Sequence, residues 1–181
     1  KNIFLVFIFF LLSNIQTLAD DRNKELDNLF IDLKNKDKEK SFLIEQKIWN
    51  IWSKHPNDKN LTFMLNKGSD LVNKNRFYDA IDIFTKVIKL DPNWAEAWNK
   101  RATVYYIVGK FQKSQKDIDK VLKLEKRHFG ALAGQGLVNI QLQNYEKAIK
   151  SYEKAQKIHP AMESPKTMIK EIKELIKNQS I

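Results

Sequence analysis

Three parts of the sequence contain residue types that could do chemistry. The segment WNKRATVYYIVGKF, residues 98–111, places a Lys-Arg pair between a tryptophan and two tyrosines, a combination suited to stacking on bases and binding phosphates. The segment GALAGQGL, residues 130–137, has the glycine content of a phosphate-binding loop. The chain also contains three histidines, a residue type that ligates metals and transfers protons: His55, His128 and His159.

None of these catalytic or metal-binding patterns is complete. No Gly-Lys-Ser or Gly-Lys-Thr follows the glycines and no strand pattern precedes them, so a phosphate loop is not expected. The histidines fall at the ends of predicted helices, where a partial positive charge is stabilising, and the chain has no cysteine. There is neither a nucleophile motif nor a carboxylate pair suited to catalysis. We therefore expect no enzyme activity, no metal and no cofactor.

The elements that position these residues repeat with a period of 34. The three segments are residues 61–94, 95–128 and 129–162. Their fourth, eighth and eleventh positions are mostly large, small and large: Met64, Gly68 and Leu71, then Trp98, Ala102 and Tyr105, then Leu132, Gly136 and Asn139. This i, i+4, i+7 spacing describes one face of a helix with a notch, at which a second helix can approach closely.

A 34-residue helix-turn-helix with this pattern resembles the tetratricopeptide repeat family. The resemblance covers residues 61–162 and rests on eight positions that recur three times. It implies an all-α fold, a right-handed superhelix of antiparallel helix pairs, whose first helices line a concave groove that binds a peptide or another protein. The chain also resembles small exported bacterial proteins of this family.

The chain departs from the family pattern at a few positions. Asn139 replaces a large residue in the third repeat, and Lys126 replaces a proline at the end of the second. The seventh position holds Lys67, Arg101 and Gln135 where an apolar side chain is usual. Long aliphatic stems can pack on the core there and direct their polar ends to water.

Helical segments flank the repeats on both sides. Residues 20–60 contain two amphipathic stretches, which we expect to form a helical pair that packs on the first repeat and caps it. Residues 163–181 contain Ser164 and Pro165, a helix-start signal, followed by an apolar face, which predicts a capping helix on the last repeat.

The 34-residue register decides how residues 98–111 are interpreted. Trp98, Ala102 and Tyr105 occupy packing positions, and Arg101 points toward the seam between helices. Among the aromatic side chains only Tyr106 faces the concave side. The rings are therefore predicted to belong to the core, and nucleic acid is not an expected partner.

The predicted groove comes from positions 5, 9 and 12 of each first helix. These residues are Leu65, Ser69, Val72, Asn99, Thr103, Tyr106, Ala133, Leu137 and Ile140. The apolar third-repeat surface near Tyr106 favours a hydrophobic segment or helix of a partner. Some members of the family grip a C-terminal carboxylate with Lys and Asn at positions that here hold Leu65 and Ser69, so that clamp is absent. The alternative is that neighbouring helices cover Leu137 and Ile140.

Lysines recur on the second helices at steps of 3, 4 and 3 residues. The set is Lys113, Lys116, Lys120, Lys123, Lys147, Lys150, Lys154 and Lys157. The stacking of repeats would align them into a ridge on the convex side. This lysine ridge could attach to an anionic membrane or polymer, or it could be a solvated face.

The charge distribution and the first residues of the sequence indicate a setting for this scaffold. The formal net charge is +10, and residues 61–160 carry eighteen basic and ten acidic side chains. Residues 1–19 read as a signal peptide, with Lys1, an apolar run over residues 3–12, and small residues at Thr17 and Ala19. We therefore expect an exported protein of the bacterial periplasm, with an extracellular location as the alternative. Its expected function is a non-enzymatic protein-interaction scaffold of the cell envelope; the partner and the oligomeric state are not specified.

Overall fold

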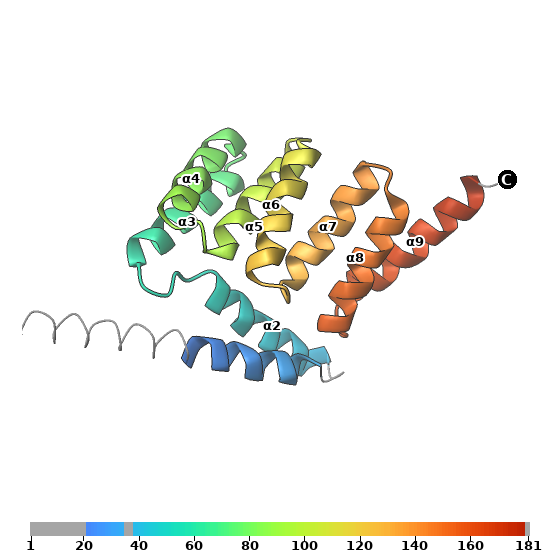
Figure 1. The fold of residues 1–181 in the computed structure, drawn as a ribbon, viewed down its shortest axis with the longest axis horizontal. Coiled ribbons are helices and arrows are strands. Elements are labelled where there is room, and N and C mark those ends of the chain that lie inside the picture. The colour runs from blue at the N-terminus through green and yellow to red at the C-terminus, as the bar shows by residue number, and fades with distance from the viewer. Residues whose placement is uncertain (1–20, 35–37, 180–181) are drawn as a thin grey trace, which may run out of the picture.

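The computed structural model describes residues 21–34 and 38–179, and all regular structure in these ranges is helical (Figure 1). The predicted signal peptide, residues 1–19, lies outside the described residues. Residues 21–33 are helical and are called the N-terminal helix here. The helices that follow are α2 (Lys38–Trp52), α3 (Lys59–Asn73), α4 (Phe77–Leu90), α5 (Ala95–Ile107), α6 (Phe111–Leu124), α7 (Phe129–Gln141), α8 (Tyr145–Ile158) and α9 (Glu163–Gln179).

Three antiparallel helix pairs form the body of the molecule: α3 with α4, α5 with α6, and α7 with α8. Neighbouring pairs stack through α4 on α5 and through α6 on α7, and α9 continues the stack on α8. The predicted all-helical architecture is confirmed. The first helix of the first repeat, α3, begins at Lys59, two residues before the predicted start of that repeat at residue 61. It begins there because the Asp58 side chain accepts hydrogen bonds from the backbone N–H groups of residues 60 and 61.

The turn inside each pair has the same backbone geometry in all three repeats. Asn75, Gly109 and Gln143 have φ values of 57°, 73° and 58°, in the left-handed region. The next residue in each turn donates a backbone hydrogen bond of 2.8 Å to a carbonyl five residues earlier. This helix C-terminal motif closes the first helix and starts the second in a fixed direction.

The predicted notches bring the two helices of a repeat together. A Cβ atom added to Gly136 would lie 2.5 Å from the Tyr152 ring, and one added to Gly68 would collide with the Phe84 ring. Both rings are fully buried. Gly68 and Gly136 are therefore required by packing inside the chain.

The aromatic and basic residues of segment 98–111 are structural. Arg101 donates hydrogen bonds of 2.7 and 2.9 Å to the carboxylate of Asp117 and one of 2.9 Å to Thr85 Oγ1. Its guanidinium lies 5.0 Å from the Trp98 ring centroid and 5.6 Å from that of Tyr105. Both rings pack against the core beside α4, so Arg101 ties α4, α5 and α6 together as the register predicted.

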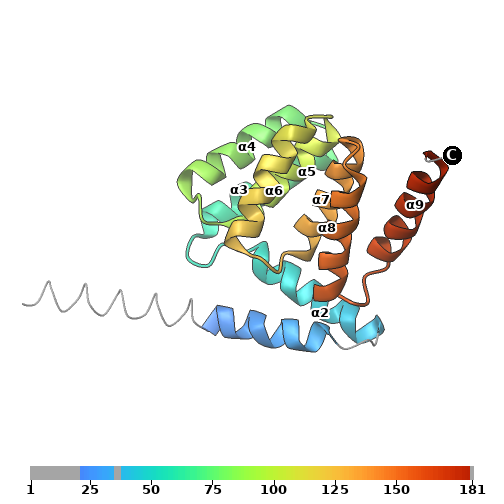
Figure 2. The same ribbon diagram turned by 45° about the vertical axis from the view of Figure 1, so that its right-hand side comes forward.

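The N-terminal pair does not cap the first repeat as predicted. The N-terminal helix and α2 cross below the three helix pairs, along the row of turns that joins one repeat to the next (Figures 1 and 2). Their apolar faces share a buried cluster with Phe129, the first residue of α7. Trp52 stacks on His128 at 4.1 Å and accepts a hydrogen bond of 2.9 Å from Trp94 through its backbone carbonyl. The expectation was wrong because the apolar residues of the pair are buried against Phe129 and His128, at the turn between the second and third repeats.

The C-terminal helix covers the last repeat as predicted. α9 buries Ile172 in a cluster with Ala148 and Tyr152 of α8. Met168, Ile169 and Ile176 pack around that cluster, whereas Leu175 stays 39% exposed.

Gly136→Ala should destabilise the protein. Overpacking against the Tyr152 ring costs roughly 1–3 kcal/mol, and alanine recovers only about 1 kcal/mol of helix propensity. We therefore expect a net fall in the free energy of unfolding of up to about 2 kcal/mol in urea titrations. An unchanged or raised value would show that the ring is free to move.

Acid should weaken the attachment of α2. Glu45 Oε2 lies 3.0 Å from His159 Nε2, and this hydrogen bond holds the pKa of the Glu45 carboxyl below its ordinary value. A lowered carboxyl pKa stabilises the fold above the unfolded-state pKa, and that contribution is lost as the pH falls through the folded-state value. The stability difference between wild type and Glu45→Gln should therefore shrink below roughly pH 4, measured by urea unfolding at several pH values. A difference that is constant with pH would contradict this assignment.

Candidate functional site

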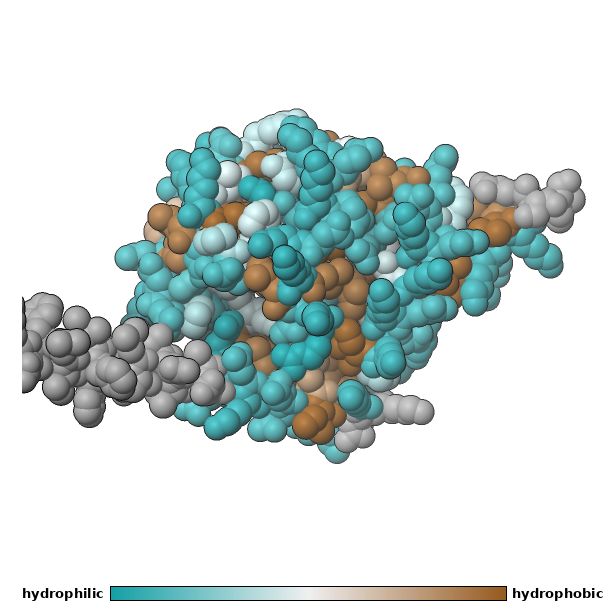
Figure 3. Space-filling model, in the orientation of Figure 1, coloured by the Kyte–Doolittle hydropathy of each residue, from teal (hydrophilic) through white to brown (hydrophobic). Residues whose placement is uncertain are grey.

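A pocket of about 70 Å³ opens between α5 and α7. Asn99, Thr103 and Tyr106 of α5 face Leu137 of α7 across it. The remaining lining residues are mostly small or apolar: Ala102, Ser114, Ile118, Gly130, Ala131 and Gly134. Apolar surface is visible near the middle of the molecule, where α5 and α7 lie above α2 (Figure 3). The pocket can therefore accept an apolar group with polar partners at its rim.

The walls of the pocket are held by contacts within the chain. The Tyr106 ring is half-buried and lies 5.6 Å from the Phe111 ring. Thr103 Oγ1 donates to the carbonyl of Asn99 at 3.0 Å, and Ser114 Oγ donates to the carbonyl of Ala102 at 2.8 Å. These bonds hold the hydroxyl groups of Thr103 on α5 and Ser114 on α6 in place.

The N-terminal pair also bounds this pocket, which the sequence did not indicate. A Cβ atom on Gly130 would lie 2.5 Å from the Trp49 ring, so α2 packs directly on one of the lining glycines. Trp49 also lies 5.3 Å from Phe129 in an edge-to-face contact. The side chain of Trp49 therefore belongs to the surroundings of the site.

Four of the nine predicted groove residues meet at the pocket: Asn99, Thr103, Tyr106 and Leu137. Leu65 is only 1% exposed, so its prediction as a groove residue was wrong; it packs in a buried cluster with Trp94 and Ala97, at the start of α5. Val72 packs on the edge of the same cluster. Ser69 donates its hydroxyl to the carbonyl of residue 65 at 3.2 Å.

The third-repeat part of the predicted groove is partly covered. Ala133 and Ile140 pack against the cluster that contains Ile172 of α9. Leu137 remains 37% exposed. The alternative reading, coverage by a neighbouring helix, therefore holds for Ile140 and not for Leu137.

Each histidine is paired with a carboxylate. His55 Nε2 lies 2.8 Å from Asp91, and His128 Nε2 lies 3.1 Å from Glu96, with both side chains of the second pair fully buried. His128 Nδ1 accepts a hydrogen bond from a backbone N–H, so Nε2 is the ring nitrogen that donates to the carboxylate. The described ranges contain no group of three or more His, Cys, Asp or Glu side chains suited to a metal. His128 therefore ties the start of α7 to α5, while its stacking on Trp52 and the bond of His159 to Glu45 join the row of turns to α2.

The glycine-rich segment is helical, and the lysines of the predicted ridge lie in several different surroundings. The glycines of GALAGQGL lie within α7, not in a loop. Lys113 and Lys120 lie over the rings of Tyr105 and Trp98, at 5.7 and 5.8 Å. The remaining ridge lysines are distributed as follows: Lys147, Lys150 and Lys154 line a cleft between α6 and α8, Lys157 lies beside the N-terminal helix, and Lys116 and Lys123 are exposed. Attachment of the ridge to a membrane or polymer stays a prediction.

No helix in the described ranges is long and apolar enough to cross a membrane.

Comparisons with known proteins agree with this geometry. Models described as tetratricopeptide repeat match residues 61–93 and 99–163. A TPR repeat-containing protein of Rhizobium etli is 32% identical over 139 residues, which are 76% of this chain and 68% of that protein. Hsp70-Hsp90 organizing protein 1 of Glycine max is 28% identical over 94 residues, 52% of this chain and only 16% of that protein.

Solved structures support the same fold. The first TPR of Spaghetti, bound to the HSP90 peptide SRMEEVD, has a TM-score of 0.63 and 23% identity over 64% of this chain and 92% of that one. The structure of MamA has a TM-score of 0.61 and 22% identity over 76% of this chain and 78% of that one. These likenesses confirm the predicted right-handed superhelix of antiparallel helix pairs. With its three repeats and its matching relatives, the chain belongs to the tetratricopeptide repeat family.

Proposed function

We propose that this protein is a non-enzymatic scaffold that binds an apolar segment of a partner protein in the pocket between α5 and α7. The observation that carries the proposal is Gly134, a glycine in the middle of α7 that lines the pocket. Glycine in a helix interior costs about 1 kcal/mol relative to alanine. A packing contact explains that cost at Gly68, Gly130 and Gly136.

No such contact explains Gly134. A Cβ atom there would approach only Ile118 Cδ1, at 3.7 Å, an ordinary van der Waals distance. The missing side chain instead leaves the pocket open toward Ile118. A partner side chain that enters the pocket would occupy this space and bury apolar surface against both helices.

The lining of the pocket indicates the chemistry of the partner. Tyr106 and Leu137 offer apolar contact at the mouth, and the small residues below leave room for one aliphatic side chain. Asn99 and Thr103 lie beside them and can hydrogen-bond the backbone of a bound segment. An amphipathic helix or a short apolar segment meets these requirements.

The acidic peptides bound by the solved relatives are not the expected ligand. Those peptides include SRMEEVD and SGPTIEEVD. In this chain Leu65 is buried and Ser69 is bonded to its own helix, so the first repeat presents no cation at these positions. Binding at the pocket should therefore persist at high salt, because salt screens charge pairs and not apolar contacts.

The predicted signal peptide supports a place for this scaffold in the cell envelope, in the periplasm if the source is a bacterium. Mass spectrometry of the protein recovered from cells should find Asp20 as its first residue. If residues 1–19 were still present on the recovered protein, the cell-envelope location would lose this support, whereas the pocket proposal would be unaffected.

Gly134→Ala should separate binding from stability. We expect the free energy of unfolding to rise by about 0.5–1 kcal/mol, since alanine favours the helix and meets no clash, while partner binding weakens. Gly136→Ala, two residues away on the same helix, is the matched control that loses stability instead. If Gly134→Ala left partner capture unchanged, the pocket would not be the binding site.

Partner capture can be measured by photo-crosslinking in cells from position 137, with position 123 on α6 as the convex-side control. We expect a defined crosslinked protein from position 137 only, retained at high salt and lost in Tyr106→Ala. Because Tyr106 is half-buried, its removal should cost only about 1 kcal/mol of stability. Equal crosslinking in wild type and Tyr106→Ala would refute the assignment.

A further inference from the structure

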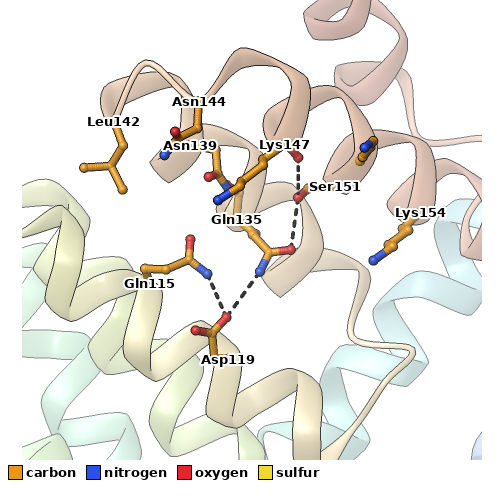
Figure 4. Close-up of a pocket in the computed structure, with 10 residues that line it drawn as sticks. Gln115, Asp119, Gln135, Asn139, Leu142, Asn144, Lys147, Ser151 and Lys154 are labelled. Atoms are coloured by element: carbon orange, nitrogen blue, oxygen red, sulfur yellow. Dashed lines mark hydrogen bonds between the residues drawn. The ribbon is translucent and has the colours of Figure 1, made fainter.

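A second hollow, of about 400 Å³, lies on a different face of α7, in the cleft between α6 and α8 (Figure 4). Gln115 and Asp119 line it from α6, and Gln135 and Asn139 line it from α7. The side of α8 contributes Asn144, Lys147, Lys150, Ser151 and Lys154, and Leu142 closes one end. Its volume falls in the range of roughly 300–1,000 Å³ typical of small-molecule sites.

The cleft exists because the third repeat lacks the side chains that fill the preceding seam. In that seam Tyr105 packs beside the core, Arg101 bridges Thr85 and Asp117, and Ile81 is buried. The residues 34 positions after Tyr105, Arg101 and Ile81 are Asn139, Gln135 and Gln115. Three large side chains are thus replaced by carboxamides on an otherwise equivalent backbone.

The carboxamides form a partly satisfied network. Gln115 Nε2 and Gln135 Nε2 donate to Asp119 Oδ1 at 2.7 and 3.4 Å, and Ser151 Oγ donates to Gln135 Oε1 at 3.0 Å (Figure 4). Asn139 is 6% exposed and donates to the backbone carbonyl of Gln135. The carbonyl oxygen of Gln115 is buried and has no hydrogen-bond partner. A buried acceptor without a partner is unfavourable, and a ligand hydroxyl or N–H in the cleft would satisfy it.

The charge of the cleft favours an anion. Lys147, Lys150 and Lys154 face the single carboxylate of Asp119, which is already engaged by two amide donors. Asn144 is the N-cap of α8 and its side chain makes no capping hydrogen bond, so the positive end of that helix also lies at the rim. Figure 4 shows Lys147 and Lys154 extending from α8 toward the α6 side of the cleft.

We propose that this cleft binds an acidic sugar. The lysines would hold its carboxylate or phosphate by charge-assisted hydrogen bonds. The carboxamides and Asp119 would accept and donate to its hydroxyls, because an amide side chain presents a donor and an acceptor in one plane. The site lies apart from the pocket at Tyr106, so the two can be occupied independently.

The test uses the full chain and three probes: glucuronate, glucose and inorganic phosphate. In NMR titrations near neutral pH, glucuronate should shift the side-chain amide resonances of Gln115, Gln135, Asn139 and Asn144 in a saturable way. Glucose lacks the anion and phosphate lacks the ring hydroxyls, so each should bind about tenfold more weakly. A response to phosphate equal to that of glucuronate would reduce the cleft to a general anion site and overturn the proposal, as would no response to glucuronate.

Two variants locate the binding. Asn139→Tyr restores the residue type found in the preceding repeat and should fill the cleft, keep the helical fold and abolish glucuronate binding. Lys147→Ala should weaken it about tenfold, whereas Lys123→Ala, an exposed lysine of the same ridge outside the cleft, should leave it unchanged. Equal losses in the two lysine variants would show diffuse attraction to the ridge and refute the cleft.

Discussion

The close approach of the two helices within each repeat is the constraint on which the rest of the structure depends. The rings of Phe84 and Tyr152 lie where the side chains of Gly68 and Gly136 would otherwise be. This spacing and the repeated left-handed turn give each repeat one shape, so the repeats stack in one way. Because the backbone is the same in each repeat, a side chain that differs from its equivalents in the other repeats changes the shape of the surface at that position. Both hollows beside α7 arise in this way.

The repeats could be predicted because their contacts recur with the period of the sequence. Arg101 reaches Asp117 across 16 residues, and the equivalent contact of Gln135 with Ser151 spans the same distance along the chain. The N-terminal pair has no period, and its contacts join distant residues, such as Glu45 and His159, which are 114 positions apart. Amphipathic pattern predicts that a helix will bury one face, but not which surface receives it.

The candidate site could be predicted only in part for a related reason. A position within the repeat indicates the side of the helix on which a residue lies, and this was sufficient for Tyr106 and Leu137. It does not indicate what covers that side, and Leu65 is buried against Trp94 and Ala97 at the start of α5. The role proposed for Gly134 depends on there being no neighbour close enough to clash with a Cβ atom, which only coordinates can show.

The course of the N-terminal pair has a mechanical consequence. Superhelical repeat arrays bend and stretch like springs, because each unit touches only its neighbours. Here α2 and the segment that follows it run past every inter-repeat turn. They contact Asp91 through His55, His128 through Trp52, and His159 through Glu45. Elongation of the array would have to break these long-range contacts together. The molecule should therefore respond to tension or denaturant as a single cooperative body instead of yielding one repeat at a time.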